Sequence, residues 1–416
     1  MEQIITNARE YMDYKQKHFA KLLDCSISRI SCIEGGENEY KPEEIPVLRK
    51  YLGIEDVPVF EEERGSFESS IYAWRDMIHE GRIEEAREKR LKLAPIVRIT
   101  HEEEFILLYR MYEASYLLFC EDDTVEARKI IELVRPSVKG TSNNIEYLFH
   151  YYSGSLNFQE GNFRVALQNY LTAYDLGDKD RKAEFSINYS IAFCYSKLGM
   201  SIQAIAQLKE ISHQYADDKS SIRGMRVFTL LSFNYICINN SEKAKELAEK
   251  SLAIAEGVGN GFFIGLNLHN LGCLYLKKKD CEKSMNYFEK ASEYLKEYKQ
   301  ESFENLYYKV LCMGAMKDKA AKDHILSAIA SAQNDDHYTI LFNSALRLLS
   351  ISSDESSQYI KEVTIPHLLK TNGNFKALMY CEELENQYKK DKLKIKAMEV
   401  GTIARDIYRI IIEGDE

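Results

Sequence analysis

The sequence YLFHYYSGSLNFQEGNFRVALQNYLTAYDL, residues 147–176, decides the fold of this 416-residue chain. Small residues stand in it at Gly154, Ala166 and Ala173, and an aromatic residue stands at Tyr170. Small residues let two helices approach closely at a crossing, and an aromatic ring fills the groove between them. The stretch therefore predicts a pair of antiparallel helices joined by a short turn.

A second stretch, NLHNLGCLYLKKKDCEKSMNYFEKASEY at residues 267–294, has the same spacing of small and aromatic residues. We call the position of Gly154, where the two helices of the pair are expected to cross, the crossing position. Equivalent positions recur at steps of 41, 39, 38, 40 and 40 residues, at Trp74, Ser115, Gly154, Ala192, Ser232 and Gly272. A small residue follows each of them by twelve positions, at Ala86, Ala127, Ala166, Ala204, Ala244 and Ser284. A nearly constant period indicates a repeat array.

These offsets resemble those of the tetratricopeptide repeat, whose period is about 34 residues, so the longer steps imply longer helices or loops. Ser241 and Asp280 are expected to cap second helices of the pairs. After Glu301 the pattern weakens, and we expect further helix pairs over residues 301–412, with a capping helix from about Lys389. The fold class is therefore all-α, a right-handed helical solenoid whose concave face is the expected interaction surface.

The composition and the absence of known motifs argue against several classes of function. The formal charge is 55 − 65 = −10, which argues against a surface that coats nucleic acid or anionic lipid along its whole length. Nine cysteines without CxxC spacing, and no apolar signal-peptide core at the start, predict a reduced, cytoplasmic chain. Nucleotide-binding, hydrolase and zinc signatures are absent from the sequence, so we expect no enzyme activity, cofactor, catalytic residue or metal site.

The first residues break the repeat period. Residues 54–65, with Pro58 and the acidic run Glu61 to Glu63, predict a linker between a head at residues 1–53 and a repeat domain at 66–416. The repeat domain is expected to bind a peptide and to mediate oligomerisation. Short helices are expected in the head at residues 4–11, 16–23, 27–34 and 42–52.

The head resembles the lambda-repressor-like helix-turn-helix domain. The matching positions are Gln16, Ala20, Leu23, Ser26, Ile30, Ser31, Ile33, Glu34 and Gly36. The resemblance implies that the helix at residues 27–34 enters the major groove of DNA and that Gln16 bonds a phosphate. Asp24 departs from the family pattern, since a glycine is usual in that turn.

The charge of the head gives partial support for DNA binding. Residues 14–33 carry four basic residues and one acidic residue, a local charge of 4 − 1 = +3, whereas residues 1–60 carry 8 basic and 11 acidic residues, a net charge of −3. This balance favours binding to DNA as a dimer, which doubles the phosphate contacts. Arg29 is the candidate for a base-edge contact, with a phosphate contact or a solvated position as the alternative. The candidate DNA-binding residues are Gln16, Lys17, Ser26, Ile27, Ser28, Arg29 and Ser31.

The order of head and repeats resembles the peptide-pheromone receptors of Gram-positive bacteria, the Rap/NprR/PlcR/PrgX (RRNPP) family, and the chain length is closest to the NprR type. The resemblance implies a homodimeric transcription regulator that binds double-stranded DNA and a short signalling peptide, with a higher oligomer as the alternative to the dimer. It equally leaves open a second function, because Rap members lack the head and act on a phosphorelay response regulator. The two activities could also coexist in one chain.

An extended peptide needs partners for its backbone N–H and C=O groups, and a side-chain amide supplies both a donor and an acceptor. Asparagines on the first helices of the pairs are therefore candidates, together with an arginine for a peptide carboxylate. The alternative for each asparagine is a hydrogen bond between helices. The candidate peptide-binding residues are Asn188, Arg226, Asn234, Asn267, Asn270 and Asn305.

Overall fold

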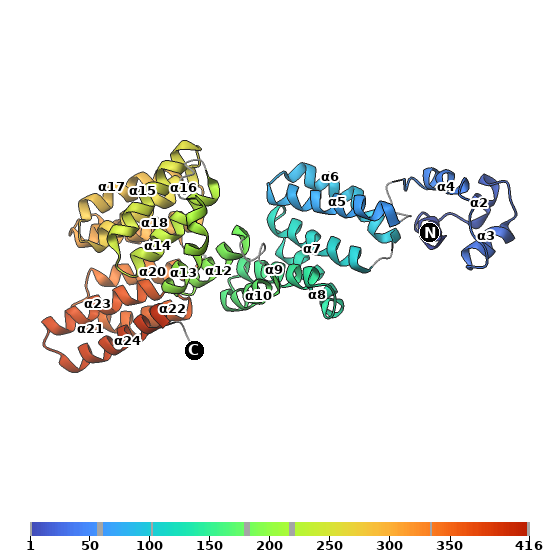
Figure 1. Cartoon of the computed structure of the whole chain (residues 1–416). Coiled ribbons are helices and arrows are strands. Elements are labelled where there is room, and N and C mark those ends of the chain that lie inside the picture. The colour runs from blue at the N-terminus through green and yellow to red at the C-terminus, as the bar shows by residue number, and fades with distance from the viewer. Residues whose placement is uncertain are drawn as a thin grey trace. The chain divides into compact units, whose positions relative to one another are not determined.

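The computed structural model describes residues 2–55, 61–100, 103–178, 184–215, 221–332 and 335–413. All regular elements in these ranges are helices, which confirms the all-α fold class (Figure 1). The chain divides into two compact units, Met1–Gly177 and Asp178–Glu416. None of the described helices is long and apolar enough to span a membrane.

Four short helices form the head at the start of the first unit. They are α1 Glu2–Tyr11, α2 Gln16–Leu22, α3 Ile27–Glu34 and α4 Glu44–Leu52. Phe19, Ile30 and Leu48 are fully buried in a core that these helices share. In the turn between α2 and α3 Asp24 has a φ of 47°, in the left-handed region that aspartate adopts more readily than most residues. A glycine is therefore not required at this turn.

The head core extends beyond residue 53. Ile54 is 3% exposed within it, and Ile99, from the end of α6, is 1% exposed in the same cluster. The Asn7 side chain donates a hydrogen bond to the Ile99 carbonyl oxygen at 3.2 Å. Of the predicted linker, residues 56–60 lie outside the described residues, and Glu61 already begins helix α5. The described residues therefore contradict the predicted bounds of the linker at both ends, because Ile54 belongs to the head core and Glu61 to α5.

Helix pairs follow the head in both units. In the first unit they are α5 Glu61–His79, α6 Ile83–Thr100, α7 Glu103–Phe119, α8 Thr124–Val138, α9 Asn143–Gln159 and α10 Phe163–Leu176. In the second unit the first pairs are α12 Phe185–Lys197, α13 Ser201–Ser212 with the 3₁₀ turn η1 His213–Tyr215, α14 Ile222–Cys237, α15 Ser241–Gly257, α16 Gly261–Lys277 and α17 Cys281–Leu295. The remaining helices are α18 Lys299–Ala315, α19 Ala321–Ser331, α20 Asp336–Leu348, α21 Asp354–Tyr359, the π-helical η2 Ile360–Thr364, α22 Ile365–Lys370, α23 Asn374–Lys390 and α24 Lys394–Glu413.

The predicted crossing positions lie where paired helices touch. Trp74 and Ser232 are fully buried, and each donates a side-chain hydrogen bond to the carbonyl oxygen twelve residues later, at 2.9 Å and 2.8 Å. In the pair of α16 and α17 the bond runs the other way, from the Ser284 hydroxyl to the Gly272 carbonyl at 2.8 Å. A Cβ atom at Gly272 would lie 2.5 Å from the Phe288 ring. The crossing therefore has no room for a larger residue.

Helix ends agree with the sequence in part. Asp280 caps α17 by accepting a hydrogen bond from the Lys283 N–H, as predicted. The predicted cap of α15 at Ser241 is wrong by one residue, because Asn240 accepts the bond from the Lys243 N–H. The last helix begins at Lys394 rather than at about Lys389.

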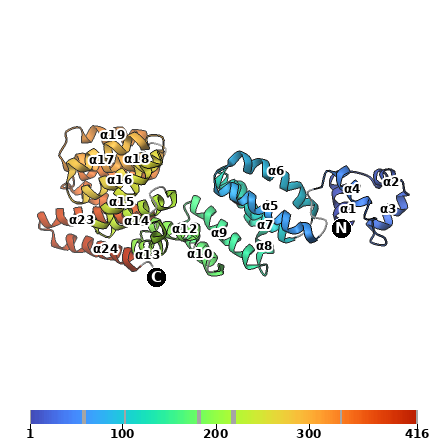
Figure 2. The same cartoon turned by 45° about the horizontal axis from the view of Figure 1, so that its top comes forward.

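The second unit closes on itself. Helices α24 and α13 are in contact, and Figures 1 and 2 show α23 and α24 returning to the beginning of this unit. The Asn374 amide donates to the Leu198 carbonyl at 3.2 Å, across 176 residues of sequence. Closer to the centre, the hydroxyl of Tyr307 donates to that of Tyr380 at 2.9 Å. These two bonds therefore join α23, near the end of the chain, to the end of α12 and to α18.

Candidate functional site

The outer face of α3 carries most of the predicted DNA-binding residues. Ile27, Ser28 and Ser31 of α3 are exposed, as is Lys17 of the preceding helix α2. Ile27 keeps 52% of its surface accessible despite its apolar side chain. The Ser26 hydroxyl caps α3 by accepting a hydrogen bond from the Arg29 N–H at 3.1 Å. The face is therefore open to a partner, whereas the Ser26 side chain serves the helix itself.

Arg29, the candidate for base contact, is engaged by another residue of the head. Its two terminal nitrogens donate to the two carboxylate oxygens of Glu44 at 2.8 Å and 2.9 Å. The hydrogen bond to this guanidinium lowers the pKa of Glu44 and raises that of Arg29. Glu44 also accepts the Lys41 N–H, so both the helix start and the ion pair hold it in place. Glu44 was not among the predicted residues, because no local motif in the sequence marks a contact fifteen residues away.

Gln16 is held by a buried network. Its amide nitrogen donates to Glu34 at 2.7 Å. Glu34 in turn pairs with Arg9 through bonds of 2.6 Å and 2.9 Å, and both side chains of this pair are 10% exposed or less. A side-chain amide nitrogen has two N–H groups, so the second one remains to donate to a phosphate. The network fixes the position from which Gln16 would do so.

The five candidate asparagines have buried side chains: Asn188, Asn234, Asn267, Asn270 and Asn305. Asn267 donates to the Ser251 hydroxyl at 3.0 Å and accepts from Thr229 at 3.3 Å. Asn305 donates to the Phe288 carbonyl at 2.9 Å. These bonds join neighbouring helices, which is the alternative that the sequence left open for each asparagine. Contact between these residues and a peptide stays a prediction.

The other three asparagines make similar bonds. Gln207 donates to Asn188 at 2.5 Å, and Asn270 donates to the Thr229 carbonyl at 3.2 Å. Asn234 donates to the Ser196 hydroxyl at 3.0 Å, while its own amide oxygen is buried and accepts no hydrogen bond from the described residues. Because Asn234 is fully buried, its free acceptor faces the protein interior and not the surface.

Arg226 differs from the asparagines because it is exposed. Its guanidinium lies 4.7 Å from the ring centre of Tyr189 and 5.6 Å from that of Phe185, so the two helices α12 and α14 together hold it. Cation–π contact uses the flat face of a guanidinium and leaves its N–H edge available to a carboxylate. The aromatic partners four residues apart on α12 were not predicted, although their spacing places them on one helix face.

Charged groups from several first helices meet deeper in the same unit. Lys376 of α23 pairs with Glu304 of α18 at 2.6 Å. Lys197 of α12 keeps contact with solvent, yet the surrounding protein desolvates it and lowers its pKa, against the attraction of Glu304. Desolvation also lowers the pKa of Lys277, which donates to the Ile236 carbonyl at 2.9 Å. Neither Lys197 nor Lys277 forms an ion pair with a carboxylate among the described residues, and an ammonium in such surroundings favours an anionic ligand.

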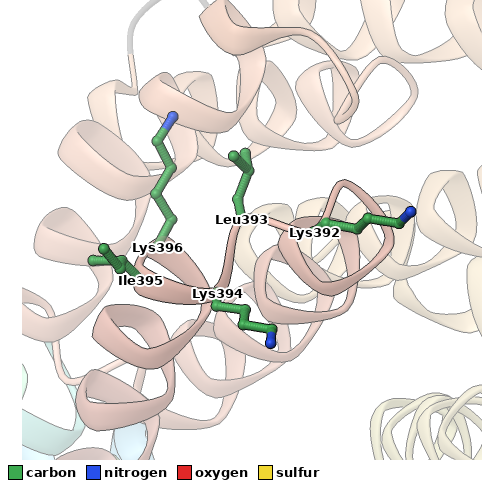
Figure 3. A pocket seen from close by; sticks show the side chains of 5 residues that line it. All are labelled: Lys392, Leu393, Lys394, Ile395 and Lys396. Atoms are coloured by element: carbon green, nitrogen blue, oxygen red, sulfur yellow. The ribbon is translucent and has the colours of Figure 1, made fainter.

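A surface pocket of about 330 Å³ lies apart from these groups, at the turn between α23 and α24. Figure 3 shows its lining of five consecutive residues, 392–396, three of them lysines. One turn supplies the whole lining, and it holds none of the predicted site residues.

The described residues form a head of four short helices followed by an array of helix pairs. No family model matches the chain. Response regulator aspartate phosphatase A of Bacillus subtilis is 24% identical over 271 residues, which is 61% of this chain and 69% of that protein. Transcriptional activator NprA of Geobacillus stearothermophilus is 21% identical over 380 residues, 88% of this chain and 93% of that protein.

The fold agrees with these sequence matches. A crystal structure of a Rap protein complexed with Competence and Sporulation Factor superposes with a TM-score of 0.71 at 15% identity, covering 84% of this chain and all of that one. The chain is therefore similar in sequence and in fold to Rap- and NprR-like proteins, which supports the resemblance to the RRNPP family that the sequence had indicated.

Proposed function

We propose that this protein is a cytoplasmic, peptide-responsive transcription regulator. In this proposal it binds double-stranded DNA as a homodimer through α3, and a short signalling peptide bound on the first helices of the repeats controls it. The observation that carries the proposal is the exposed α3 face, with Ile27, Ser28 and Ser31 open on a head that has its own core. The relatedness to the protein named transcriptional activator NprA supports it.

The test of DNA binding uses the full-length chain and two variants that each add one negative charge. Ser28→Glu places a carboxylate on the exposed α3 face, where it would repel phosphates. Ser69→Glu makes the same change on an exposed position of α5 and serves as the matched control. We expect the wild type and Ser69→Glu to capture the same genomic fragments and Ser28→Glu to capture none. Equal capture by all three proteins would contradict the role of α3.

Salt dependence gives a second readout. If two heads each neutralise about four phosphates, log affinity falls against log salt with a slope of about −7. Fluorescence anisotropy on a captured fragment measures that slope. A salt-independent signal would identify binding that does not involve phosphates.

The alternative function is a protein-binding scaffold that alters a phosphorelay response regulator and has no catalytic residues of its own. The relatedness to response regulator aspartate phosphatase A and the net charge of −10 favour this candidate. The same charge variant separates the two functions in cells. Loss of the cellular effect in Ser28→Glu supports DNA binding, whereas an unchanged effect supports the scaffold.

A further inference from the structure

One face of α12 carries a continuous row of aromatic and cationic side chains. Phe185, Tyr189 and Phe193 follow one another at intervals of four residues, with ring centres 5.1 Å and 5.7 Å apart. The row ends at Lys197, whose ammonium lies 5.4 Å from the Phe193 ring. Residues four apart lie on the same side of a helix, so these four side chains form one strip.

Helix α14 adds cations to the other end of this strip. The guanidiniums of Arg223 and Arg226 each lie 5.6 Å from the Phe185 ring centre. Both arginines are exposed, and no carboxylate in the described part of the chain pairs with either of them. Arg347 provides the contrast within the same unit, because it lies 5.3 Å from the Tyr359 ring and also pairs with Glu355 at 2.8 Å.

The strip is both partly accessible and positively charged. Phe185 and Phe193 are half-buried, so each ring keeps some surface for a ligand. Tyr189 is 9% exposed, and its ring packs against the guanidinium of Arg226. Cations stand at both ends, and none of the four residues of the α12 strip is acidic. A ligand that fits it has an apolar side chain and a negative charge, and a guanidinium fork matches a carboxylate best.

We propose that this strip binds the C-terminal end of the regulating peptide, with the free carboxylate on Arg226 and an adjacent apolar side chain on Phe193. The inference rests on the proposed peptide-receptor function and adds the chemistry of the ligand. It assigns new roles to Phe185 and Tyr189, which hold the guanidinium of Arg226 in place, and to Phe193, which contacts the ligand.

Two synthetic libraries of random hexapeptides test the proposal on the full-length chain. One library ends in a free carboxylate and the other in an amide. After incubation, peptides that co-elute with the protein in size-exclusion chromatography are counted by mass spectrometry. We expect at least a tenfold excess of peptides from the carboxylate library, with apolar residues enriched next to the C-terminus.

Variants locate the binding. Arg226→Ala is expected to lose the tenfold excess, and Phe193→Ala is expected to lose the preference for apolar residues. Arg405→Ala removes an exposed arginine of α24 and is expected to change nothing. Circular dichroism melting curves of all three variants check that each one folds, and Arg226→Lys tests the fork, since it keeps the charge and loses the two-pronged geometry.

The outcomes distinguish a failure of the proposed binding strip from a failure of the peptide-receptor function. Equal retention of both libraries, or amide peptides retained through an internal Asp or Glu, overturns the C-terminal assignment and leaves the receptor function standing. An unchanged excess in Arg226→Ala overturns the site. Retention of no peptide by the wild type contradicts the receptor function itself.

Discussion

Arg29 and Glu44 form a two-pronged ion pair that joins the predicted recognition helix to the first turn of α4. The side chains are 28% and 12% exposed, so solvent screens the pair in part. The residue expected to face DNA is therefore already satisfied within the head, and binding a base or a phosphate requires the guanidinium to exchange partners.

Removing the carboxylate should free Arg29 for DNA. We expect Glu44→Gln to strengthen binding to an unselected 20-base-pair duplex and to steepen the salt slope by about one phosphate contact per head. Fluorescence anisotropy over a range of salt concentrations measures both effects. Glu43→Gln, an exposed neighbour, is the control for the loss of one charge. Weaker binding by Glu44→Gln would mean that the ion pair orients Arg29 for DNA.

Arg29→Ala tests the base contact itself. If Arg29 reads a base edge, its loss should relax the preference at one base pair by about 1–3 kcal/mol. If it contacts a phosphate, affinity should fall by a similar factor on every sequence. Selection of binding sites by the wild type and the variant distinguishes these results.

The crossing at Gly272 should tolerate no side chain. A Cβ atom there would lie 2.5 Å from the ring of the buried Phe288, and overpacking of this kind costs about 1–3 kcal/mol. We expect Gly272→Ala to lower the free energy of unfolding by this amount in urea titrations. Gly257→Ala is the control, because nothing lies within 4 Å of its Cβ position and alanine favours the helix. A neutral Gly272→Ala would show that the ring moves aside.

Removing either hydroxyl of the bond between Tyr307 and Tyr380 should lower the free energy of unfolding, but by different amounts. Tyr380 also lies within hydrogen-bonding reach of Ser344, whereas the Tyr307 hydroxyl donates to Tyr380. Tyr380→Phe therefore leaves a buried hydroxyl without this partner and should cost about 1–3 kcal/mol, and Tyr307→Phe should cost less. The double variant should cost less than the sum of the two single ones. Strict additivity would show that the two hydroxyls are energetically independent.

The pair of His337 and His367 should make stability depend on pH. Their ring nitrogens lie 2.9 Å apart, and burial lowers the pKa of both, with Lys376 and Lys370 adding to the effect. Between the folded pKa values and the unfolded value near 6.5 the unfolded chain binds more protons, so the free energy of unfolding falls as the pH drops through that window. Neutral imidazoles contribute their full stability only above it.

Urea titrations between pH 7.5 and 5 measure this dependence. We expect His337→Gln to flatten the curve, while His269, which is also buried with a lowered pKa, keeps part of the slope. His213→Gln, at an exposed position, should leave the slope unchanged. A His337→Gln curve as steep as that of the wild type would show that His337 does not contribute to the pH dependence.

The sequence by itself determined the elements that depend on residues close together in the chain. The spacing of small residues predicted the helix crossings, and helix α3 begins at Ile27 and ends at Glu34 as expected. Such features follow from helical periodicity and from capping residues within one turn of the helix. For this reason the predicted cap of α15 at Ser241 lies only one residue from the observed cap, Asn240. The candidate residues for DNA and for the peptide were chosen by residue type, and their roles stay predictions.

The contacts of those side chains follow from the packing of helices that are distant in the sequence. Asn267 and Asn305 are bound to neighbouring helices, and Arg29 is bound to Glu44. Tyr307 meets Tyr380 because the second unit closes across 73 residues. These contacts depend on how distant helices pack and on which rotamers the packing allows. The period of the repeat determines neither the packing of distant helices nor the rotamers, because it depends only on contacts between helices that are neighbours in the sequence.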